Sequence, residues 1–521
     1  MLSRLLAAAA LITIASPLSA DDGKWWAAES DRFKVYSEGT RDDAVAMATK
    51  LERLDQAMRL FRGMPLDATE VPESSKVTVY QFGEIRDIGK LAGSDGVAGF
   101  FISRAGDSVA FVPLKEERER QSNSSAGTRD QTEFYNWNLP PEKVLFHEYT
   151  HYFMYQHAPA AYPHWYSEGF AELFATLELT PTGFNLGAVP EYRQGMIQRF
   201  NINADRMFNP PKLFTYEDAM MGYSIGWLMT SYLNFEPSRQ GQLANYLRLL
   251  NSGTKSIDAA RQAFGDLDTL EKELNAYRKQ RARGVSVQFP VMSVPEVQAR
   301  ELTPAESARM MLHMQQNAGV TREKAKRIVS DARKLAAAHP RSVPVLLTAT
   351  EAEFDAGNLR EAGTMAKQVL AVDPESVEAH LFLARVAMEY AKKESAYLEV
   401  ARTHYVTANK LNSQHPEALA GYYRTFVLAG ETPPENALIA LENAYGYAPF
   451  DKDIRKTLAH LLLTEKRDRE ALIMLSSIIN SPHDSKEAKK YRDLVAKLEQ
   501  GNRQPLLDAL KPKLVEEKDT A

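Results

Sequence analysis

The sequence predicts two structural units, an α+β domain over residues 21–289 and an all-α solenoid of helical hairpins over residues 303–510. In the first unit, short alternating strand patterns are interspersed with segments whose apolar residues have helical spacing. In the second unit the recognisable patterns are helical, and prolines return about every 34 residues. Between the units, two prolines and a loss of periodicity predict a linker at residues 290–302.

The first 20 residues have the pattern of a secretory signal peptide. Arg4 supplies a positive charge, residues 5–15 form an apolar run, and Ser19-Ala20 end the segment with small residues. The apolar run is shorter than the roughly 20 residues that a helix needs to cross a bilayer. We therefore expect an exported protein, periplasmic or secreted, without a membrane span.

The composition limits the kinds of cross-link, metal site and partner that the protein can have. The 521 residues include no cysteine, which excludes disulfide bonds and thiolate metal sites. Any metal ion must therefore be held by His, Asp or Glu. The formal net charge of −5 is small for this length and does not indicate nucleic-acid binding.

The elements of the α+β unit follow from local patterns. Residues 33–36 and 76–82 predict strands, and residues 42–61 have apolar residues at helical spacing. Residues 97–102 and 108–112 predict two more strands, joined by a short connection that contains Gly. We expect these strands to form a mixed sheet.

Less regular segments follow. Residues 115–138 are charged and polar and predict a loop over the cleft, which leaves open whether the loop is a lid. Farther along, residues 216–234 and 240–250 predict helices.

The most informative motif is H-E-x-x-H at residues 147–151. On a helix, positions i and i+4 share a face, so His147 and His151 can present two imidazoles to one ion. Glu148 can point into the same cleft and take a proton from water. The alternative is a core helix whose histidines only form hydrogen bonds.

A second motif, W-x-x-E-G-x-x-E, spans residues 165–172. Glu168 and Glu172 are also four residues apart and face one way on a helix. One carboxylate can bind a metal, and the other can accept the outer N–H of a ligating imidazole. We expect Glu168 to be the third ligand, because two His, one carboxylate and an open position make a catalytic zinc site.

Together, the two motifs resemble those of the gluzincin metallopeptidases, the clan of thermolysin-like and aminopeptidase-like enzymes. The resemblance is closest to the bacterial peptidase-MA-like proteins. It implies a thermolysin-like domain with one Zn²⁺ per chain and Glu148 as the general base. The zinc ligands that it implies are His147, His151 and Glu168. It further implies that Glu172 orients a ligating histidine.

One feature departs from the best-known members of the clan. Glu168 follows His151 by 17 residues, slightly closer than is usual there. This spacing implies a shorter connection between the two helices. It leaves Glu172 and His164 open as alternatives for the third ligand.

The resemblance also suggests roles outside the motifs. In gluzincins an edge strand of the sheet pairs with the extended substrate backbone. The matching strand is residues 96–102, with Gly99 and Phe100 as substrate-binding residues, although an ordinary core hairpin fits the same pattern. Relatives often carry a Tyr on a helix after the glutamates. Tyr223 is therefore the candidate donor to an oxyanion, although a Tyr on such a helix can also simply be packed.

The C-terminal unit repeats. Prolines lie at positions 340, 374, 416, 449 and 482, at intervals of 34, 42, 33 and 33 residues. A period near 34 closed by Pro is the tetratricopeptide signature, and Ala362, Ala437 and Ala471 provide small residues where paired helices approach. A generic helical bundle is the alternative. Such a solenoid offers a surface for a peptide, a protein partner or the neighbouring domain, and residues 511–521 predict a charged, frayed tail.

The interpretation is an exported zinc metallopeptidase with a tetratricopeptide tail, acting on a peptide or protein that the sequence does not name. Two other classes remain open. One is a catalytically inactive, peptidase-like binding protein, and the other is a periplasmic assembly factor or chaperone that holds unfolded clients. Zinc dependence of cleavage distinguishes the enzyme from both.

Overall fold

The computed structural model describes most of the chain between residues 24 and 514. The described residues are 24–66, 71–94, 97–115, 140–158, 160, 162–209, 215–280, 282–288, 296–479 and 485–514. The predicted signal peptide, nearly all of the predicted 115–138 loop, the first part of the predicted linker and most of the predicted charged tail lie outside them. Within the described ranges, no helix is both long and apolar enough to cross a membrane.

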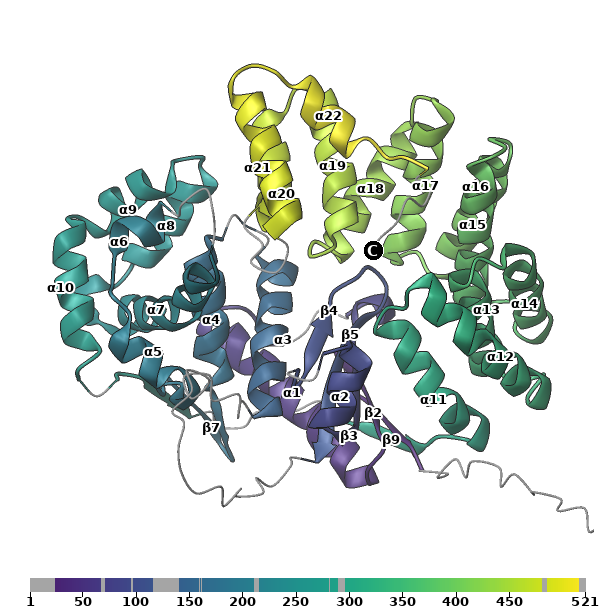
Figure 1. The fold of residues 1–521 in the computed structure, drawn as a ribbon, viewed down its shortest axis with the longest axis horizontal. Coiled ribbons are helices and arrows are strands. Elements are labelled where there is room, and N and C mark those ends of the chain that lie inside the picture. Colours follow the sequence, from purple (N-terminus) through teal and green to yellow (C-terminus); the bar gives the residue numbers. More distant parts are fainter. Residues whose placement is uncertain are drawn as a thin grey trace, which may run out of the picture.

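A six-stranded mixed sheet forms the centre of the first unit (Figure 1). Its strands are β1 (Trp26–Glu29), β2 (Phe33–Ser37), β3 (Val77–Glu84), β4 (Phe100–Ile102), β5 (Ser108–Lys115) and β9 (Gln298–Glu301). Their order is β4-β5-β3-β2-β1-β9, so β4 is an edge strand. β2, β3 and β5 run parallel, whereas β4 and β5 form an antiparallel hairpin. The mixed sheet and the predicted strands are confirmed, except that the strand predicted at residues 97–102 is confined to residues 100–102.

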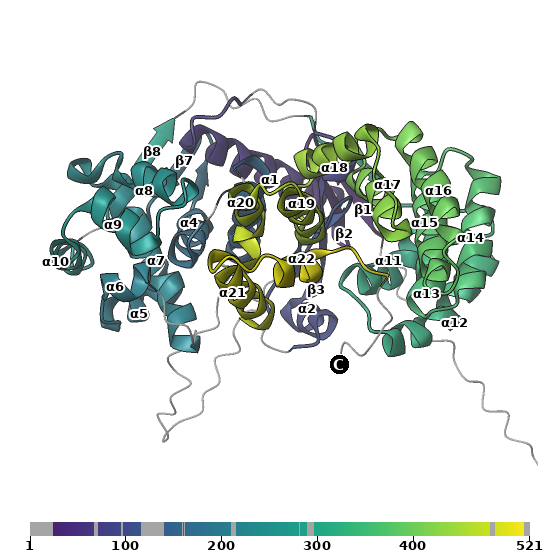
Figure 2. The same ribbon diagram turned by 90° about the horizontal axis from the view of Figure 1, so that it is seen from above.

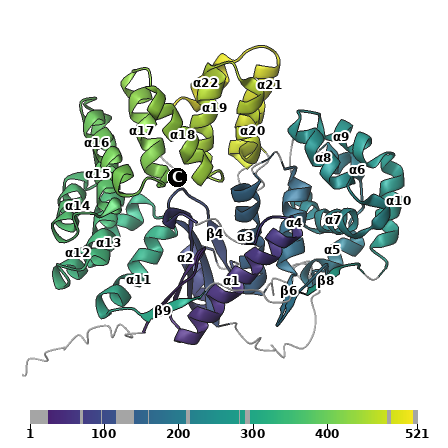
Figure 3. The same ribbon diagram turned by 180° about the vertical axis from the view of Figure 1, so that it is seen from behind.

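Each face of the sheet has its own helices. The helices are α1 (Arg41–Phe61), α2 (Ile85–Ala92), α3 (Pro141–His157) and α11 (Pro304–Asn317). Successive strand residues point to opposite faces, so Val79 packs with α1 and α3 while Tyr80 packs with α2 and α11. Figure 1 shows α2 and α11 on one face, and Figure 3 shows α1 on the other.

After α3 the first unit is mainly helical. Its helices are α4 (His164–Ala175), α5 (Gln194–Arg199), α6 (Ala204–Phe208), α7 (Tyr216–Phe235), α8 (Gln242–Asn251), α9 (Ser256–Phe264) and α10 (Leu267–Tyr277). A small antiparallel sheet contains β6 (Glu178–Thr180), β7 (Gly183–Leu186) and β8 (Val285–Gln288). The helices predicted at residues 216–234 and 240–250 are confirmed by α7 and α8.

The C-terminal region is helical, as predicted, and forms an arch that begins beside the sheet and continues above it (Figures 1 and 2). The helices are α12 (Arg322–Ala338), α13 (Val343–Asp355), α14 (Leu359–Val372), α15 (Val377–Ala391), α16 (Tyr397–Leu411), α17 (Pro416–Ala429), α18 (Glu435–Tyr447), α19 (Lys452–Thr464), α20 (Asp468–Ile479), α21 (Ser485–Glu499) and α22 (Gln504–Leu510). Ala362, Ala437 and Ala471 are fully buried where paired helices meet.

The chain passes from the first unit to the second through the sheet itself. Four residues of the segment predicted to be a linker form β9, which pairs antiparallel with β1. The next helix, α11, begins the segment predicted to be the solenoid, yet Met310 and Met314 are fully buried in the sheet core. The two units therefore share a strand and a helix.

Candidate metal centre

The two motif helices are buried because their apolar residues lie all round the helix, as expected of helices in a domain interior. α3 begins after Pro140 with Pro141 at its first position, where a missing N–H costs nothing. α4 begins after Pro163, and each residue from Trp165 to Ala175 is buried. The two helices pack together and bring their polar residues to one place.

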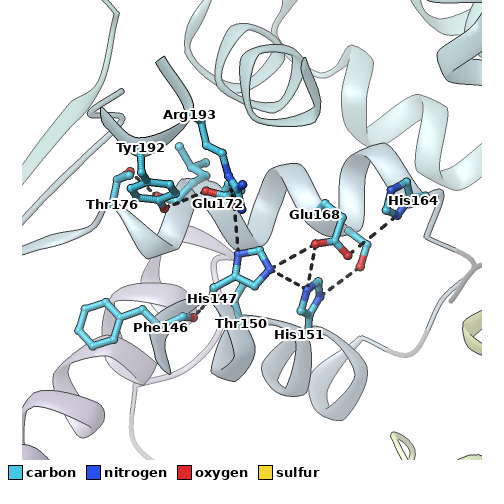
Figure 4. Close-up of polar contacts among 12 residues, drawn as sticks. Phe146, His147, Thr150, His151, His164, Glu168, Glu172, Thr176, Tyr192 and Arg193 are labelled. Atoms are coloured by element: carbon cyan, nitrogen blue, oxygen red, sulfur yellow. Dashed lines mark hydrogen bonds and ion pairs between the residues drawn. The ribbon is translucent and has the colours of Figure 1, made fainter. Parts of the chain in front are cut away.

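Three side chains from these helices converge (Figure 4). The two Nε2 atoms of His147 and His151 are 3.2 Å apart. Oε2 of Glu168 lies 3.2 Å from Nε2 of His147 and 3.5 Å from Nε2 of His151. Four-coordinate zinc with bonds of about 2.0–2.1 Å has ligand atoms about 3.3 Å apart. The three atoms therefore lie where three corners of a zinc tetrahedron would be.

The donor set also fits a metal ion chemically. Two imidazole nitrogens and one carboxylate oxygen form a typical ligand set for zinc in a catalytic site. Glu168 is fully buried, and its second oxygen, Oε1, has no hydrogen-bond partner among the described residues. A buried carboxylate of this kind is costly unless a positive charge compensates it. The group can thus hold a metal ion.

The charged groups of the cluster shift one another's pKa values. Burial acts to raise the pKa of Glu168, but the imidazoles of His151 and His147 outweigh it and hold this pKa well below its usual range. Burial acts to lower the pKa of His147, but the hydrogen bond with Glu168 and the charge of Glu172 raise it overall. The cluster thus favours an ionised carboxylate beside positive charge.

Glu172 lies on the other side of the His147 ring. Its Oε1 is 3.8 Å from Nδ1 of His147, opposite the nitrogen that faces His151 and Glu168. Arg193 donates to the same oxygen at 2.8 and 3.0 Å, and the Tyr192 hydroxyl donates to Oε2 at 2.8 Å. The position of Glu172 is that of a residue orienting an imidazole, rather than of a third ligand.

Tyr192 and Arg193 were not found by reasoning from the sequence. They lie in a short 3-10 turn, Glu191–Arg193, which is too brief to show a periodic pattern. The one available signal is Pro190 before the turn, and it indicates only a local bend. Their role depends on the fold, which brings the turn over Glu172.

The remaining neighbours of the cluster come from the second motif. Oγ of Ser167 lies 3.2 Å from Nδ1 of His151, so the outer nitrogen of this ring also has a polar neighbour. Nδ1 of His164 lies 4.0 Å from Oε1 of Glu168, on the side away from the two imidazoles. His164 is thus a neighbour of the carboxylate and lies outside the converging group.

Tyr223 and Glu148 lie beside the cluster. The Tyr223 ring is 5.7 Å from the His147 ring, and the Arg193 guanidinium lies 4.7 Å from the Tyr223 centroid. Burial and the charges of Glu168 and Glu148 raise the pKa of Tyr223 well above its usual range, so its hydroxyl stays a donor. Glu148 is half-buried, and its charge acts on the pKa values of both His147 and Tyr223.

Two glycines let α4 approach α7 closely. A Cβ atom on Gly169 would lie 2.2 Å from the carbonyl oxygen of Gly226, and a Cβ on Gly226 would lie 2.3 Å from the carbonyl oxygen of Trp165. The backbones of the two helices therefore touch next to Glu168. A Cβ on Gly222 would lie 2.3 Å from Nε2 of His164, so Gly222 likewise makes room for that ring.

The predicted substrate-binding residues lie on the edge hairpin. Gly99 precedes β4, and a Cβ there would lie 3.3 Å from Cγ1 of Val144 on α3. The Phe100 ring stacks on Phe111 at 4.6 Å, on the sheet face that α11 covers. Phe101 faces the other way, toward Tyr152 of α3 at 5.7 Å. The structure thus places the start of β4 against the helix that carries His147.

The chain matches no protein-family model, and no curated protein matches it in sequence. The convergence of His147, His151 and Glu168 is the feature of this chain that indicates a metal centre.

Proposed function

We propose that this protein is an exported zinc-dependent metallopeptidase of the gluzincin type, with a thermolysin-like domain and tetratricopeptide-like repeats. The observation that carries the proposal is the triangle of ligand atoms from His147, His151 and Glu168, with sides of 3.2, 3.2 and 3.5 Å. A purely structural zinc site would need a fourth protein ligand. Among the described residues, the metal-ligating group has three members.

The residues around this triangle fit peptide hydrolysis. A zinc ion bound there supplies a Lewis acid that polarises a carbonyl group and makes water more acidic. Glu148 takes the proton from the attacking water and delivers it to the leaving amine nitrogen as the C–N bond breaks. Tyr223 donates a hydrogen bond to the carbonyl oxygen as negative charge develops on it. Glu172, held by Tyr192 and Arg193, keeps His147 in its orientation.

The proposed substrate is an extended peptide. β4 is an edge strand that starts beside α3, so a peptide adding to this edge would run past His147. The backbone of Gly99 and Phe100 would provide the pairing groups, because the Phe100 side chain is stacked in the core. The repeats provide further surface for a substrate or a protein partner.

The decisive experiment separates metal binding from turnover. We expect close to one zinc ion per chain by elemental analysis, and zinc-dependent cleavage of a mixed peptide library that a chelator abolishes. Glu148→Gln should retain the metal and lower the cleavage rate by at least about 100-fold. Glu142→Gln is the matched control, because Glu142 lies on the same helix but pairs with Lys50 at the surface.

Three results would contradict the proposal. A wild-type protein that does not bind zinc would exclude the metallopeptidase. A zinc-bound protein that binds library peptides without cleaving them would instead support an inactive, peptidase-like binding protein. Peptide binding that is independent of zinc would support an assembly factor or chaperone that uses the repeats.

A further inference from the structure

The tip of the β4–β5 hairpin is held by the repeat region. Oδ2 of Asp451 accepts a hydrogen bond from the backbone N–H of Ala105 at 2.9 Å. Gly106 lies directly against the buried ring of His415, because a Cβ on Gly106 would be 2.9 Å from Cε1 of that ring. Both contacts come from connections between successive helical hairpins of the repeats, α16–α17 and α18–α19.

The α18–α19 connection, residues 448–451, also contacts the helix that carries the histidines. The ring of Phe450 packs on that of Tyr152 at 4.8 Å, and Tyr152 immediately follows His151 on α3. Next to it, the Ser75 hydroxyl donates to the carbonyl oxygen of Tyr447 at 3.3 Å. Phe450 is only 8% exposed, so this contact is part of the continuous core. One connection of four residues therefore contacts both α3 and the turn that joins β4 to β5.

This arrangement matters because β4 packs through Phe100 on Phe111 and through Phe101 toward Tyr152, but its backbone has few hydrogen-bond partners. It consists of three residues and pairs with β5 on one side alone. Its beginning lies close to α3, where a Cβ on Gly99 would be 3.3 Å from Cγ1 of Val144. Its end leads into the hairpin tip at Ala105 and Gly106, next to Arg104, which donates to the Asn317 carbonyl oxygen of α11. A short edge strand held at one end only would open readily, because local opening costs least where few contacts must break.

We infer that the α18–α19 connection positions β4 beside α3, so that the repeat region sets how well an extended peptide pairs with this edge. The inference depends on the proposed function and adds the repeats to it as part of substrate binding. Phe450 and Asp451 are positioning residues in this scheme, because they act through α3 and the hairpin. A partner that displaces the connection would then lower substrate affinity without touching the metal ligands.

The test uses Asp451→Asn in the full-length, zinc-loaded protein. Oδ1 of Asp451 caps α19 through the N–H groups of Asp453 and Ile454, and Asn is as good an N-cap as Asp. The substitution replaces the oxygen that faces the Ala105 N–H by an NH₂ group, which cannot accept a hydrogen bond. Asp266→Asn is the matched control, because Asp266 also caps a helix, α10, which lies at the outer side of the molecule, away from β4 and β5 (Figures 1 and 3).

We expect Asp451→Asn to leave the zinc content unchanged and to speed amide hydrogen exchange in residues 100–111. For the library peptide that wild type cleaves best, KM should rise about 3- to 10-fold, while kcat stays within about twofold. Asp266→Asn should match wild type in zinc content, amide exchange, KM and kcat. A pure stability effect would instead speed exchange throughout the protein and leave KM unchanged.

The inference is overturned if Asp451→Asn exchanges and cleaves like wild type, or if faster exchange in the hairpin leaves KM unchanged. A wild-type protein that cleaves no library peptide overturns the proposed function and the inference with it. These failures are distinguishable, because the first two require an active wild-type protein.

Discussion

The close contact between α4 and α7 predicts the effect of Gly169→Ala. A Cβ on Gly169 would lie 2.2 Å from the Gly226 carbonyl oxygen and 2.5 Å from Oγ1 of Thr230. An ordinary contact needs 3.4 Å or more, so the helices must separate by about 1 Å. Overpacking of this kind costs about 1–3 kcal/mol. The obstacle here is backbone, which moves less easily than a side chain, so we expect the upper value of about 3 kcal/mol. Replacing a helical Gly by Ala recovers about 0.5–1 kcal/mol, which leaves a net loss of about 2 kcal/mol.

The same movement should disturb the metal centre, because Glu168 is adjacent to the substituted residue. We expect a lower unfolding temperature in differential scanning calorimetry and at least about a tenfold weaker affinity for zinc, measured by competition with a chelator. Gly195→Ala is the matched control: it lies in α5, a Cβ there meets nothing within 4 Å, and we expect slight stabilisation. If Gly169→Ala unfolds and binds zinc like wild type, the packing argument is wrong.

Three further predictions concern individual side chains. Tyr223→Phe should lower kcat about 100- to 1,000-fold with KM within about twofold, because the proposed oxyanion donor is lost. A variant whose KM rises while kcat is unchanged would contradict this role. Glu172→Gln should weaken zinc binding about 10- to 100-fold in the chelator assay, because His147 loses its charged partner; unchanged affinity would exclude the orienting role. Burial and the neighbouring charge of Asp355 raise the pKa of Glu351 to about 8 from its usual 4.5, so folded stability should fall as the pH rises from about 4.5 to 8. Glu351→Gln should reduce this slope in thermal unfolding, with a gain on the order of 1 kcal/mol at pH 8 and none near pH 4. Part of the slope remains, because burial also raises the pKa of Asp355, to about 6; equal pH dependence in both proteins would refute the prediction.

The sequence predicted the histidine pair because its spacing is local. His147 and His151 are one helical turn apart, so helix geometry places this pair. Glu168 was chosen from the second motif, and its position beside the two rings depends on the packing of α4 on α3. Tyr192 and Arg193 could not be found in this way, because a three-residue turn has no period and its position over Glu172 depends on tertiary packing.

The sequence likewise predicted the individual strands and helices better than their connections. β2, β3 and β5 are apolar and buried, which makes their pattern strong. β9 has the sequence Gln-Ala-Arg-Glu and is mostly exposed, so nothing in its composition distinguishes it from a linker. The contact between Asp451 and Ala105 joins residues 346 positions apart and has no local signature.

The shared sheet determines where this protein can be divided. A fragment that stops at residue 289, where the prolines suggest a boundary, would lack β9 and leave the backbone of β1 without its outer partner. It would also lack α11, whose Asn317 binds the buried Tyr80 hydroxyl at 2.8 Å, and would expose the aromatic face beneath that helix. Unpaired strand edges and uncovered apolar faces cause aggregation. A soluble fragment with the histidine cluster must therefore be expressed at least as far as Asn317.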